Sequence, residues 1–443
     1  MTAGAAPVSR LMGWILALLW PFTLVHILTG AYPPVTAAAT GLFLVYLLLA
    51  LATMHMAARA LSLLLVAATA AVAWTDGTWD QSLSGFQGAM VFAAFLPSIF
   101  LLRNAFAGDT RLISYRDAVA AATPEQQKGQ LLVGSHVLGS TLTVGAFAIL
   151  APVIPGDASA AHRRDLAVAA IFGVGLSVVW SPAFVAMAVV TDFMPDVALW
   201  KLVLLGLLMA AIGIGLAMLR VRTPQRLRLV FNGLWMLRHV VPWVALAACV
   251  IILASAVANV STLVAASLTL PPLAALMLAL QPGAIRRAAL VRTRGNLDNM
   301  GAEISIVALA FTLGAVMLAS PTVQQVVAGF LGPGIPSLLL IAGIVAIMMA
   351  VVLVGGHPIV IASILLAVFA SADTGLDSLF VAAAVLLGWG CGSMIAPAGL
   401  IIIVSTSMFN VTRRDVILSR HAWTLVAFAS AGIALLTLLD AVF

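Results

Sequence analysis

Charged side chains are scarce in this sequence. Asp, Glu, Lys and Arg together make up 8% of its 443 residues, whereas 63% of the residues are hydrophobic. Soluble globular domains carry about 25% charged residues, so the composition excludes a soluble fold. It predicts instead an all-α polytopic membrane protein. The formal net charge of +6 comes mostly from arginines in short clusters between apolar runs, which indicates membrane orientation and no nucleic-acid partner.

Cysteine is also rare, and the two cysteines, Cys249 and Cys391, lie far apart in apolar surroundings. They predict neither a disulfide framework nor a metal site. The sequence has no Walker A pattern and no HExxH spacing, which argues against an ATP-driven pump and against a zinc hydrolase. We expect no enzyme, and no cofactor beyond a coupling ion, Na⁺ or H⁺.

One stretch occurs twice. Residues 173–183 read GVGLSVVWSPA and residues 388–398 read GWGCGSMIAPA, so an offset of 215 (397 − 182) aligns two glycines, a proline and an alanine without a gap. Each copy lies in an apolar run long enough to span a bilayer, yet contains paired glycines and a proline, which an uninterrupted helix disfavours. Each copy is therefore predicted to be a helix broken near the membrane centre. Such paired breaks in corresponding halves point to a transporter binding site.

Eleven apolar runs are predicted to span the membrane, because each approaches or exceeds the roughly 20 residues that a spanning helix needs. The runs are 11–31, 36–54, 57–75, 84–104, 166–193, 197–219, 240–258, 261–281, 300–319, 377–409 and a final run after Arg420. The first follows a single arginine, Arg10, without a convincing cleavage site, so we expect it to be retained.

Arginine placement distinguishes these spans from two further segments, 105–153 and 320–372. If both segments crossed the membrane as ordinary spans, the clusters around Arg163 and Arg413 would lie outside, against the positive-inside bias. If both are re-entrant hairpins, with tips at 134–136 and 355–358, every arginine cluster becomes cytoplasmic. We therefore predict two hairpins, a cytoplasmic amino terminus, an external carboxyl terminus and a multi-pass protein of the cell inner membrane.

This topology makes the chain an inverted-topology repeat. Residues 1–31 are an extra first span, 32–222 the first repeat and 223–443 the second. The first repeat contains the hairpin 105–153, open to the cytoplasm, and the broken helix 166–193. The second contains the hairpin 320–372, open to the outside, and the broken helix 377–409. At the predicted tips, VGSHV (133–137) and VGGHP (354–358) share a valine, a glycine and a histidine.

The arrangement resembles the ion transporter superfamily, in particular its divalent anion/sodium symporter branch. The resemblance covers nearly the whole chain by architecture, but only the two tips and the two breaks by motif. It implies elevator-like alternating access in a homodimer. That branch has Ser-Asn-Thr at its tips and Thr-Pro or Pro-Pro-Asn at its breaks. This chain keeps the glycines and the prolines of the breaks, Pro182 and Pro397, but its tips read Gly-Ser-His and Gly-His-Pro, without the Asn and Thr ligands.

We predict a substrate site at the two tips and the two breaks. Its residues are Gly134, Ser135, His136, Ser177, Ser181, Pro182, Gly356, His357, Pro358, Gly392, Ser393, Ala396 and Pro397. The predicted ion-coupling residues are Ser135, His136, Gly173, Gly175, His357, Gly388 and Gly390. The alternatives are hydrogen bonds of the serines to their own helices, packing of the histidines, and close helix packing at the glycines. The position of the serines and histidines at the breaks and tips favours a role in a binding site. The position of the glycines beside the prolines favours a role in breaking the helices.

Helix amino termini at the breaks would bind an anion without a buried arginine, because their N–H groups are free and their dipole ends are positive. The predicted function is secondary transport of small organic anions, of carboxylate or sulfonate type, coupled to sodium or protons. The alternatives are a channel, or an intramembrane enzyme that uses His136 and His357 together with Asp192. The expected partners are the substrate anion, the lipid bilayer and a second copy of the chain.

Overall fold

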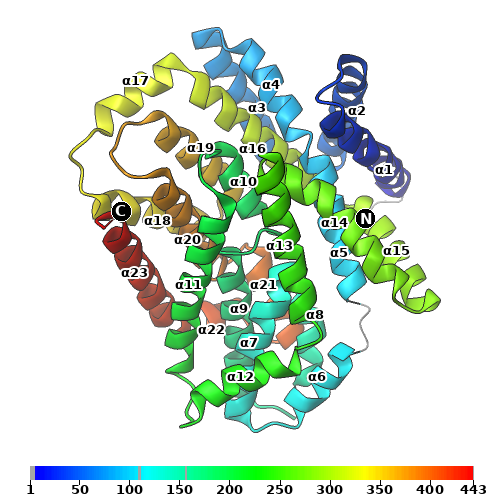
Figure 1. The fold of residues 1–443 in the computed structure, drawn as a ribbon, viewed down its shortest axis with the longest axis vertical. Coiled ribbons are helices and arrows are strands. Elements are labelled where there is room, and N and C mark those ends of the chain that lie inside the picture. The colour runs from blue at the N-terminus through cyan, green and yellow to red at the C-terminus, as the bar shows by residue number, and fades with distance from the viewer. Residues whose placement is uncertain (1–4, 108–110, 155–156, 443) are drawn as a thin grey trace. The chain divides into compact units, whose positions relative to one another are not determined.

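The chain is helical throughout the part that the structure describes. This computed structural model describes residues 5–107, 111–154 and 157–442, and every regular element in these ranges is a helix (Figure 1). The prediction of an all-α polytopic chain is confirmed. Nine helical segments in the described ranges are long and apolar enough to cross a bilayer. They correspond to the nine unbroken spans of the sequence analysis, and the two remaining predicted spans are broken helices.

The chain forms two compact units, and each unit takes residues from both predicted repeats. Unit 1 takes its described residues from Met1–Gly108, Val257–Gly334 and Ser363–Gly375, and unit 2 from Asp109–Ala256, Ile335–Ala362 and Leu376–Phe443. The predicted repeats are divisions of the sequence, so they differ from these spatial units, and the repeat boundaries stay a prediction.

Unit 1 consists mainly of spanning helices. Its helices are α1 (Ala5–Leu28), α2 (Pro33–Thr53), α3 (Met56–Asp76), α4 (Trp79–Ala89), α5 (Phe92–Phe106), α14 (Thr262–Ala279), α15 (Gly283–Leu297), α16 (Gly301–Ala319) and α17 (Pro321–Phe330). α4 and α5 together form one span, longer than the predicted run 84–104. α15 carries four arginines and an amide-rich end, and Asn104 at the end of α5 donates hydrogen bonds to Thr293 and Asn296 of α15.

Unit 2 contains both broken helices. Its helices before residue 260 are α6 (Arg111–Ala120), α7 (Pro124–Leu142), α8 (Gly145–Leu150), the 3₁₀ turn η1 (Ala151–Val153), α9 (Ala160–Val178), α10 (Val185–Phe193), α11 (Leu199–Met218), α12 (Arg226–Met236) and α13 (Val241–Ala258). The later ones are α18 (Ser337–Leu353), α20 (Ser378–Ser393), α21 (Leu400–Phe409), α22 (Arg413–Ile417) and α23 (His421–Asp440). α19 (Pro358–Ser371) begins in unit 2 and ends in unit 1.

Local sequence fixes where the key helices of unit 2 begin. Thr123 and Gln126 form a capping box at the start of α7, with Pro124 in the first helical turn. Ser159 accepts a hydrogen bond from the backbone N–H of His162 and so caps α9, and Asp377 caps α20 in the same way through Leu379.

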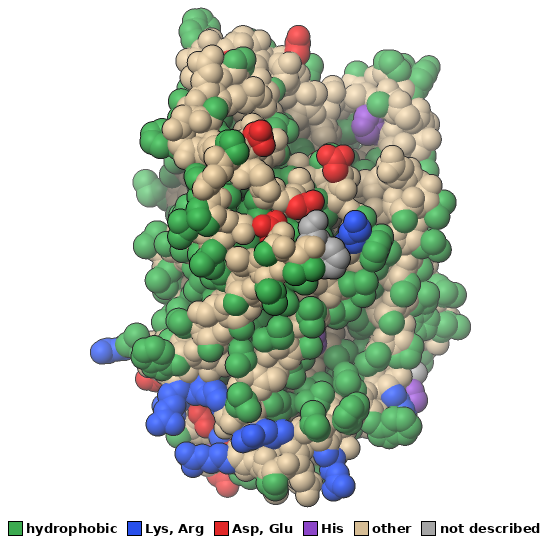
Figure 2. Space-filling model, turned by 60° about the vertical axis from the view of Figure 1, so that its left-hand side comes forward, with side chains coloured by type: hydrophobic (Ala, Val, Ile, Leu, Met, Phe, Trp, Pro, Cys, Tyr) green, Lys and Arg blue, Asp and Glu red, His purple; other side chains and the backbone are tan. Residues whose placement is uncertain are grey.

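α9 and α20 form the core of unit 2. From Ala170 to Val178, and from Phe380 to Gly392, every residue is buried. A helix that is apolar and buried on all sides lies inside a larger bundle. Elsewhere unit 2 exposes large apolar side chains, for example Leu204 and Leu253, as a bilayer-facing surface requires. On the face drawn in Figure 2, Lys and Arg side chains gather at the lower end, where Figure 1 places α6 and α12, and hydrophobic side chains dominate above them.

The chain leaves the arginine-rich end of unit 2 at the start of α7 and is at the same end again at the start of α9. Lys128 near the start of α7 forms a 2.8 Å ion pair with Asp165 near the start of α9. The backbone N–H of Arg222 donates to Glu125 of α7 over 2.8 Å. α7 has 19 residues and is therefore about 28 Å long, so the chain must return over a similar distance before α9 begins. This course is compatible with the predicted re-entrant hairpin, which stays a prediction.

The predicted tip of this first hairpin, at 134–136, is wrong. Gly134, Ser135 and His136 lie in the middle of α7, and the chain reverses at Thr143, whose φ is 49°. The small residues do not interrupt the helix. They let neighbouring groups approach it, since the Tyr115 hydroxyl lies directly against Gly134 and donates to the Gln130 carbonyl oxygen.

The predicted second tip, at 355–358, coincides with a turn. α18 ends at Leu353 and α19 begins at Pro358. Gly355 has a φ of 96°, which only glycine adopts without strain. The valine, glycine and histidine shared by the two predicted tips therefore do not mark equivalent turns. In the first segment they lie inside a helix, and in the second they lie at the reversal of the chain.

Single cysteines test the topology. In a Cys249→Ser background, Ala160→Cys and Leu418→Cys should react with an impermeant maleimide only from the cytoplasmic side, because both positions are exposed and lie next to the arginine clusters. Asp196→Cys, in the exposed connection between α10 and α11, should react only from outside. Labelling of Ala160→Cys and Asp196→Cys from one and the same side would contradict the predicted orientation.

Candidate functional site

The two helix breaks predicted from the repeated stretch are present, both in unit 2. α9 ends at Val178 and α10 begins at Val185, while α20 ends at Ser393 and α21 begins at Leu400. The offset of 215 that aligns the two sequences also relates these boundaries, since 178 + 215 = 393 and 185 + 215 = 400. The sequence repeat is thus a repeat of backbone structure.

The backbone hydrogen bonds inside the two breaks repeat as well. Each break contains three turn-like bonds from an N–H to an earlier carbonyl. In the first break they run from Trp180 to Ser177, from Ser181 to Ser177 and from Phe184 to Ser181. In the second they run from Ile395 to Gly392, from Ala396 to Gly392 and from Gly399 to Ala396. Every donor and acceptor in the second set is the first-set residue plus 215, so both breaks have the same turn.

The broken helices cross at two corresponding glycines. Gly175 lies directly against the side chain of Met394, and a Cβ atom on Gly390 would lie 3.0 Å from Val179 and 3.1 Å from the Gly175 carbonyl oxygen. Val179 and Met394 also correspond under the offset. The contact of Met394 with Gly175 is therefore equivalent to the contact of Val179 with Gly390. Such reciprocal contacts are the mark of a two-fold relation between equivalent elements. Each of the two helices breaks shortly after this crossing.

The predicted role of the four glycines as chain breaks is wrong. Gly173, Gly175, Gly388 and Gly390 lie inside α9 and α20, and the breaks begin several residues later. Gly173 packs against Leu132 and Ser135 of α7, and Gly388 packs against Met348 of α18. The glycines allow close helix packing, the alternative given above. The predicted role of these glycines in ion coupling stays a prediction.

His136 is held between two partners. Its Nδ1 lies 3.3 Å from the Gly173 carbonyl oxygen, and its Nε2 accepts a 3.3 Å hydrogen bond from the indole N–H of Trp180. Since the carbonyl can only accept, Nδ1 carries the proton and the ring is a neutral imidazole. His136 therefore joins α7 to the first break, an arrangement that favours a structural role over proton carriage.

The serines differ in what they contact. Ser135 and Ser177 donate to carbonyl oxygens of their own helices, at Leu132 and Val174. Ser181, beside Pro182, instead donates over 2.6 Å to the Ser140 carbonyl oxygen and accepts from the Ala183 N–H. Ser140 lies in the last turn of α7, where carbonyls have no helical partner. Ser181 thus closes the end of α7 and the first break together.

The second break is more open than the first. Ser181, Pro182 and Ala183 are buried, whereas Ser393 and Pro397 are half-buried and Ala398 is exposed. Ala396 is buried, and Gly392 packs against Val352 of α18. At the second tip, Gly356 folds back against Val351 of α18, and the Nδ1 atom of His357 is buried without a hydrogen-bond partner among the described residues.

Two basic side chains reach the second break from the first residues of α22 and α23. Arg413 donates over 3.2 Å to the Pro397 carbonyl oxygen, and His421 Nε2 lies 3.1 Å from the Met394 carbonyl oxygen. Sequence analysis missed both residues, because neither lies in the repeated stretch. It also missed Trp180 and Ser140, because their partners lie far away in the sequence. Arg413 is exposed, so the expectation that the helix amino termini bind an anion without a buried arginine stays a prediction. An arginine cluster directly after a broken helix was the available signal.

Both breaks present uncapped helix amino termini. Phe184 and Gly399, the N-cap residues of α10 and α21, have extended backbones and give no side-chain cap. The first N–H groups of a helix have no partner within it, and together with the dipole they attract an anion. No group of His, Cys, Asp and Glu among the described residues has the arrangement of a metal site.

The chain is distantly similar in structure to a membrane transporter. The solved structure of the YdaH transporter of Alcanivorax borkumensis, described as having an unusual topology, aligns over 86% of this chain and 97% of that chain, with 10% identity and a TM-score of 0.48. No protein-family profile and no curated protein matches the sequence. Membership of the ion transporter superfamily stays a prediction.

A pair of glycines on α11 tests the packing around the first break. A Cβ atom on Gly206 would overlap the Val179 carbonyl oxygen, whereas nothing lies within 4 Å of one on Gly215. Gly206→Ala should lower the free energy of unfolding by about 1–3 kcal/mol. Gly215→Ala should be neutral or stabilising, since alanine favours a helix by up to about 1 kcal/mol. Thermal unfolding in detergent measures both, and equal melting temperatures would contradict the contact.

The two buried serines of the first broken helix form a second matched pair. Ser181→Ala leaves the Ser140 carbonyl and the Ala183 N–H without their partner, which should cost about 1–3 kcal/mol of stability. Ser177→Ala removes only a bond within α9 and should change stability by less than about 1 kcal/mol. Thermal unfolding again gives the measurement. A Ser177→Ala variant that is as unstable as Ser181→Ala would show that the hydrogen bond to α7 is not the cause.

Proposed function

We propose that this protein is a secondary active transporter of small organic anions, of carboxylate or sulfonate type. The observation that carries the proposal is the pair of uncapped amino termini, of α10 and α21, that follow corresponding breaks after two buried helices of unit 2. Irregular backbone within a membrane protein is tolerated where it lines a cavity or a binding site. Paired half-helices of this kind bind anionic substrate groups in secondary transporters.

The free groups at the breaks favour an anion over a cation. At the second break, Arg413 and His421 already bond the Pro397 and Met394 carbonyl oxygens, which are the atoms that a cation would need. The N–H groups at the start of α21 remain, beside a positive arginine. An anion would accept from these donors and gain from the helix dipole, worth about 0.3–1 kcal/mol at each terminus and more when buried.

The proposal includes elevator-like alternating access. The two breaks and the helices that pack on them belong to one compact unit with its own core. The reciprocal glycine crossing supports the inverted repeat, because two elements related by a two-fold axis give a site that can open to either side. A cell inner-membrane location, a cytoplasmic amino terminus and a homodimer complete the proposal.

The coupling ion is proposed to be Na⁺ or H⁺. Proton coupling through His136 is disfavoured, because both of its ring nitrogens have partners in the neutral form. His357 is the better proton carrier of the two, since its Nδ1 atom has no described partner. The same contacts weigh against an intramembrane enzyme that uses both histidines, because His136 contacts a carbonyl and an indole and no nucleophile.

Uptake into proteoliposomes tests the function and its coupling. The purified protein should accumulate at least one labelled acid from a panel of small carboxylates and sulfonates, driven by an inward Na⁺ gradient or an inward H⁺ gradient. If protons couple, His357→Gln should abolish accumulation driven by a pH gradient while exchange of substrate across the membrane continues. His239→Gln, at an exposed histidine in the connector before α13, is the matched control.

Two results would overturn parts of this proposal. Uptake of none of the acids under either gradient would exclude an organic-anion transporter. Uptake that requires Na⁺, ignores the pH gradient and survives His357→Gln would assign coupling to sodium and leave His357 a structural residue.

A further inference from the structure

Unit 2 contains a second polar site, away from the helix amino termini at the breaks. A cavity of about 110 Å³ lies at its arginine-rich end, between α7, α9, α11 and α23. Its polar lining consists of Lys128, Asp165, Arg220, His421 and Thr424, and Phe172 forms part of its apolar wall. A water needs about 10–15 Å³ of such space. The cavity is therefore large enough for a small polyatomic ligand.

His421 gives this cavity a buried acceptor. The residue is fully buried, and its ring packs edge-on against Phe172 at 5.8 Å. Nε2 faces the Met394 carbonyl oxygen and so carries the proton of the neutral ring, which leaves Nδ1 as an acceptor. Among the described residues Nδ1 has no hydrogen-bond partner. Buried polar atoms are nearly always paired, and His421 is a lining residue of the cavity, so a donor bound at its edge would supply the missing partner.

Arg220 gives the cavity a cation that forms no ion pair with a carboxylate among the described residues. Its Nη1 donates to the Arg420 carbonyl oxygen over 2.8 Å and to Thr424 Oγ1 over 2.6 Å, and both acceptors are neutral. Burial lowers the pKa of Arg220, as expected for a cation that has lost part of its water.

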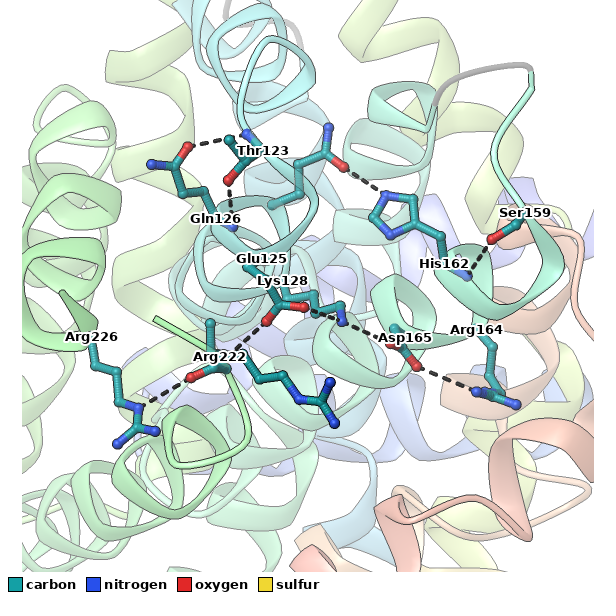
Figure 3. Close-up of polar contacts among 12 residues, drawn as sticks. Thr123, Glu125, Gln126, Lys128, Ser159, His162, Arg164, Asp165, Arg222 and Arg226 are labelled. Atoms are coloured by element: carbon teal, nitrogen blue, oxygen red, sulfur yellow. Dashed lines mark hydrogen bonds and ion pairs between the residues drawn. The ribbon is translucent and has the colours of Figure 1, made fainter. Parts of the chain in front are cut away.

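The other charges that line the cavity are already paired. Lys128 lies between Glu125 and Asp165, at 2.8 Å from each (Figure 3). Partial burial lowers the pKa of Lys128, but the hydrogen bonds to these two carboxylates outweigh it and leave the pKa above its ordinary value. Asp165, on the rim, has a side chain that is 40% exposed. Among the residues that line the cavity, Lys128 and Asp165 cancel and Arg220 leaves one positive charge, although Asp165 lies close enough to raise the pKa of Arg220 in part.

From these contacts we infer that the cavity is a second anion site, which binds a small oxyanion that also carries a hydroxyl group, such as hydrogenphosphate. The anionic oxygens accept from Arg220, and the hydroxyl donates to Nδ1 of His421. Thr424, which already accepts from Arg220, orients the guanidinium toward the cavity. The site is independent of the transported substrate, because it uses none of the residues at the two helix amino termini.

The site is connected to the second break through His421. The same imidazole that lines the cavity also bonds the Met394 carbonyl oxygen, and the Met394 side chain packs on Gly175 at the helix crossing. An oxyanion bound to Nδ1 fixes the orientation of the imidazole and thereby holds the turn after α20. Occupancy by an anion at the arginine-rich end therefore stabilises one of the two breaks.

Thermal unfolding of the purified full-length protein tests this site, with inorganic phosphate as the probe and sulfate at equal ionic strength as the comparison. Sulfate has similar size but no hydroxyl at neutral pH. Phosphate should raise the melting temperature in a saturable way, and sulfate should do so much less. Arg220→Gln should weaken the apparent phosphate affinity by at least about tenfold, since a charge-assisted bond contributes that much.

Two further variants complete the test. His421→Gln can keep the donor to the Met394 carbonyl but removes the Nδ1 acceptor, so it should also abolish the preference for phosphate over sulfate. Arg222→Gln, at a neighbouring arginine outside the cavity, should respond like the unchanged protein. The proposal is overturned if phosphate has no effect, if sulfate is equally effective, or if both Arg220→Gln and His421→Gln keep the full response. Because binding is measured without transport, failure here is distinguishable from failure to transport an organic anion.

Discussion

The structure of unit 2 depends on one constraint: backbone N–H and C=O groups inside a membrane protein need partners. A break in a buried helix frees several of them at once. At the first break, turn-like backbone bonds and Ser181 supply partners, and Ser181 also closes the end of α7. At the second, Arg413 and His421 bond the carbonyls of Pro397 and Met394. What remains are the N–H groups at the starts of α10 and α21, and these are the groups that an anionic substrate would need.

The glycines contribute indirectly to the pairing of backbone groups at the breaks. A broken helix is stable only if its two parts are held by neighbours, and here one of these neighbours is the other broken helix. Gly175 and Gly390 let the two backbones meet at their crossing, and each helix places a larger side chain, Met394 or Val179, against the glycine of the other. Because equivalent residues meet, one substitution in an ancestral repeat would have altered both sides of the contact together.

The sequence predicts the fold further than it predicts the site. Hydropathy identifies the nine unbroken spans, and the paired proline and glycine pattern identifies the breaks, because both signals are local. The first hairpin tip fails, since the Gly134–Ser135–His136 segment suits a turn and a tightly packed helix equally well, and only the approach of Tyr115 and Gly173 decides between them. Arg413 and His421 could not be assigned to the second break, because their contacts depend on where α22 and α23 fold back. The same holds for the pairing of His136 with Trp180, since no local pattern joins residues 44 positions apart.

The two breaks share their backbone but not their chemistry. The first is buried and held by uncharged side chains of its own half, His136, Trp180 and Ser181. The second is partly exposed and held by an arginine and an imidazole from the arginine-rich end. A backbone repeat fixes where the free N–H groups lie, whereas side chains can diverge without moving them. The two breaks thus keep equivalent helix amino termini, while the second contacts a charged side chain and the first lies in a buried, uncharged environment.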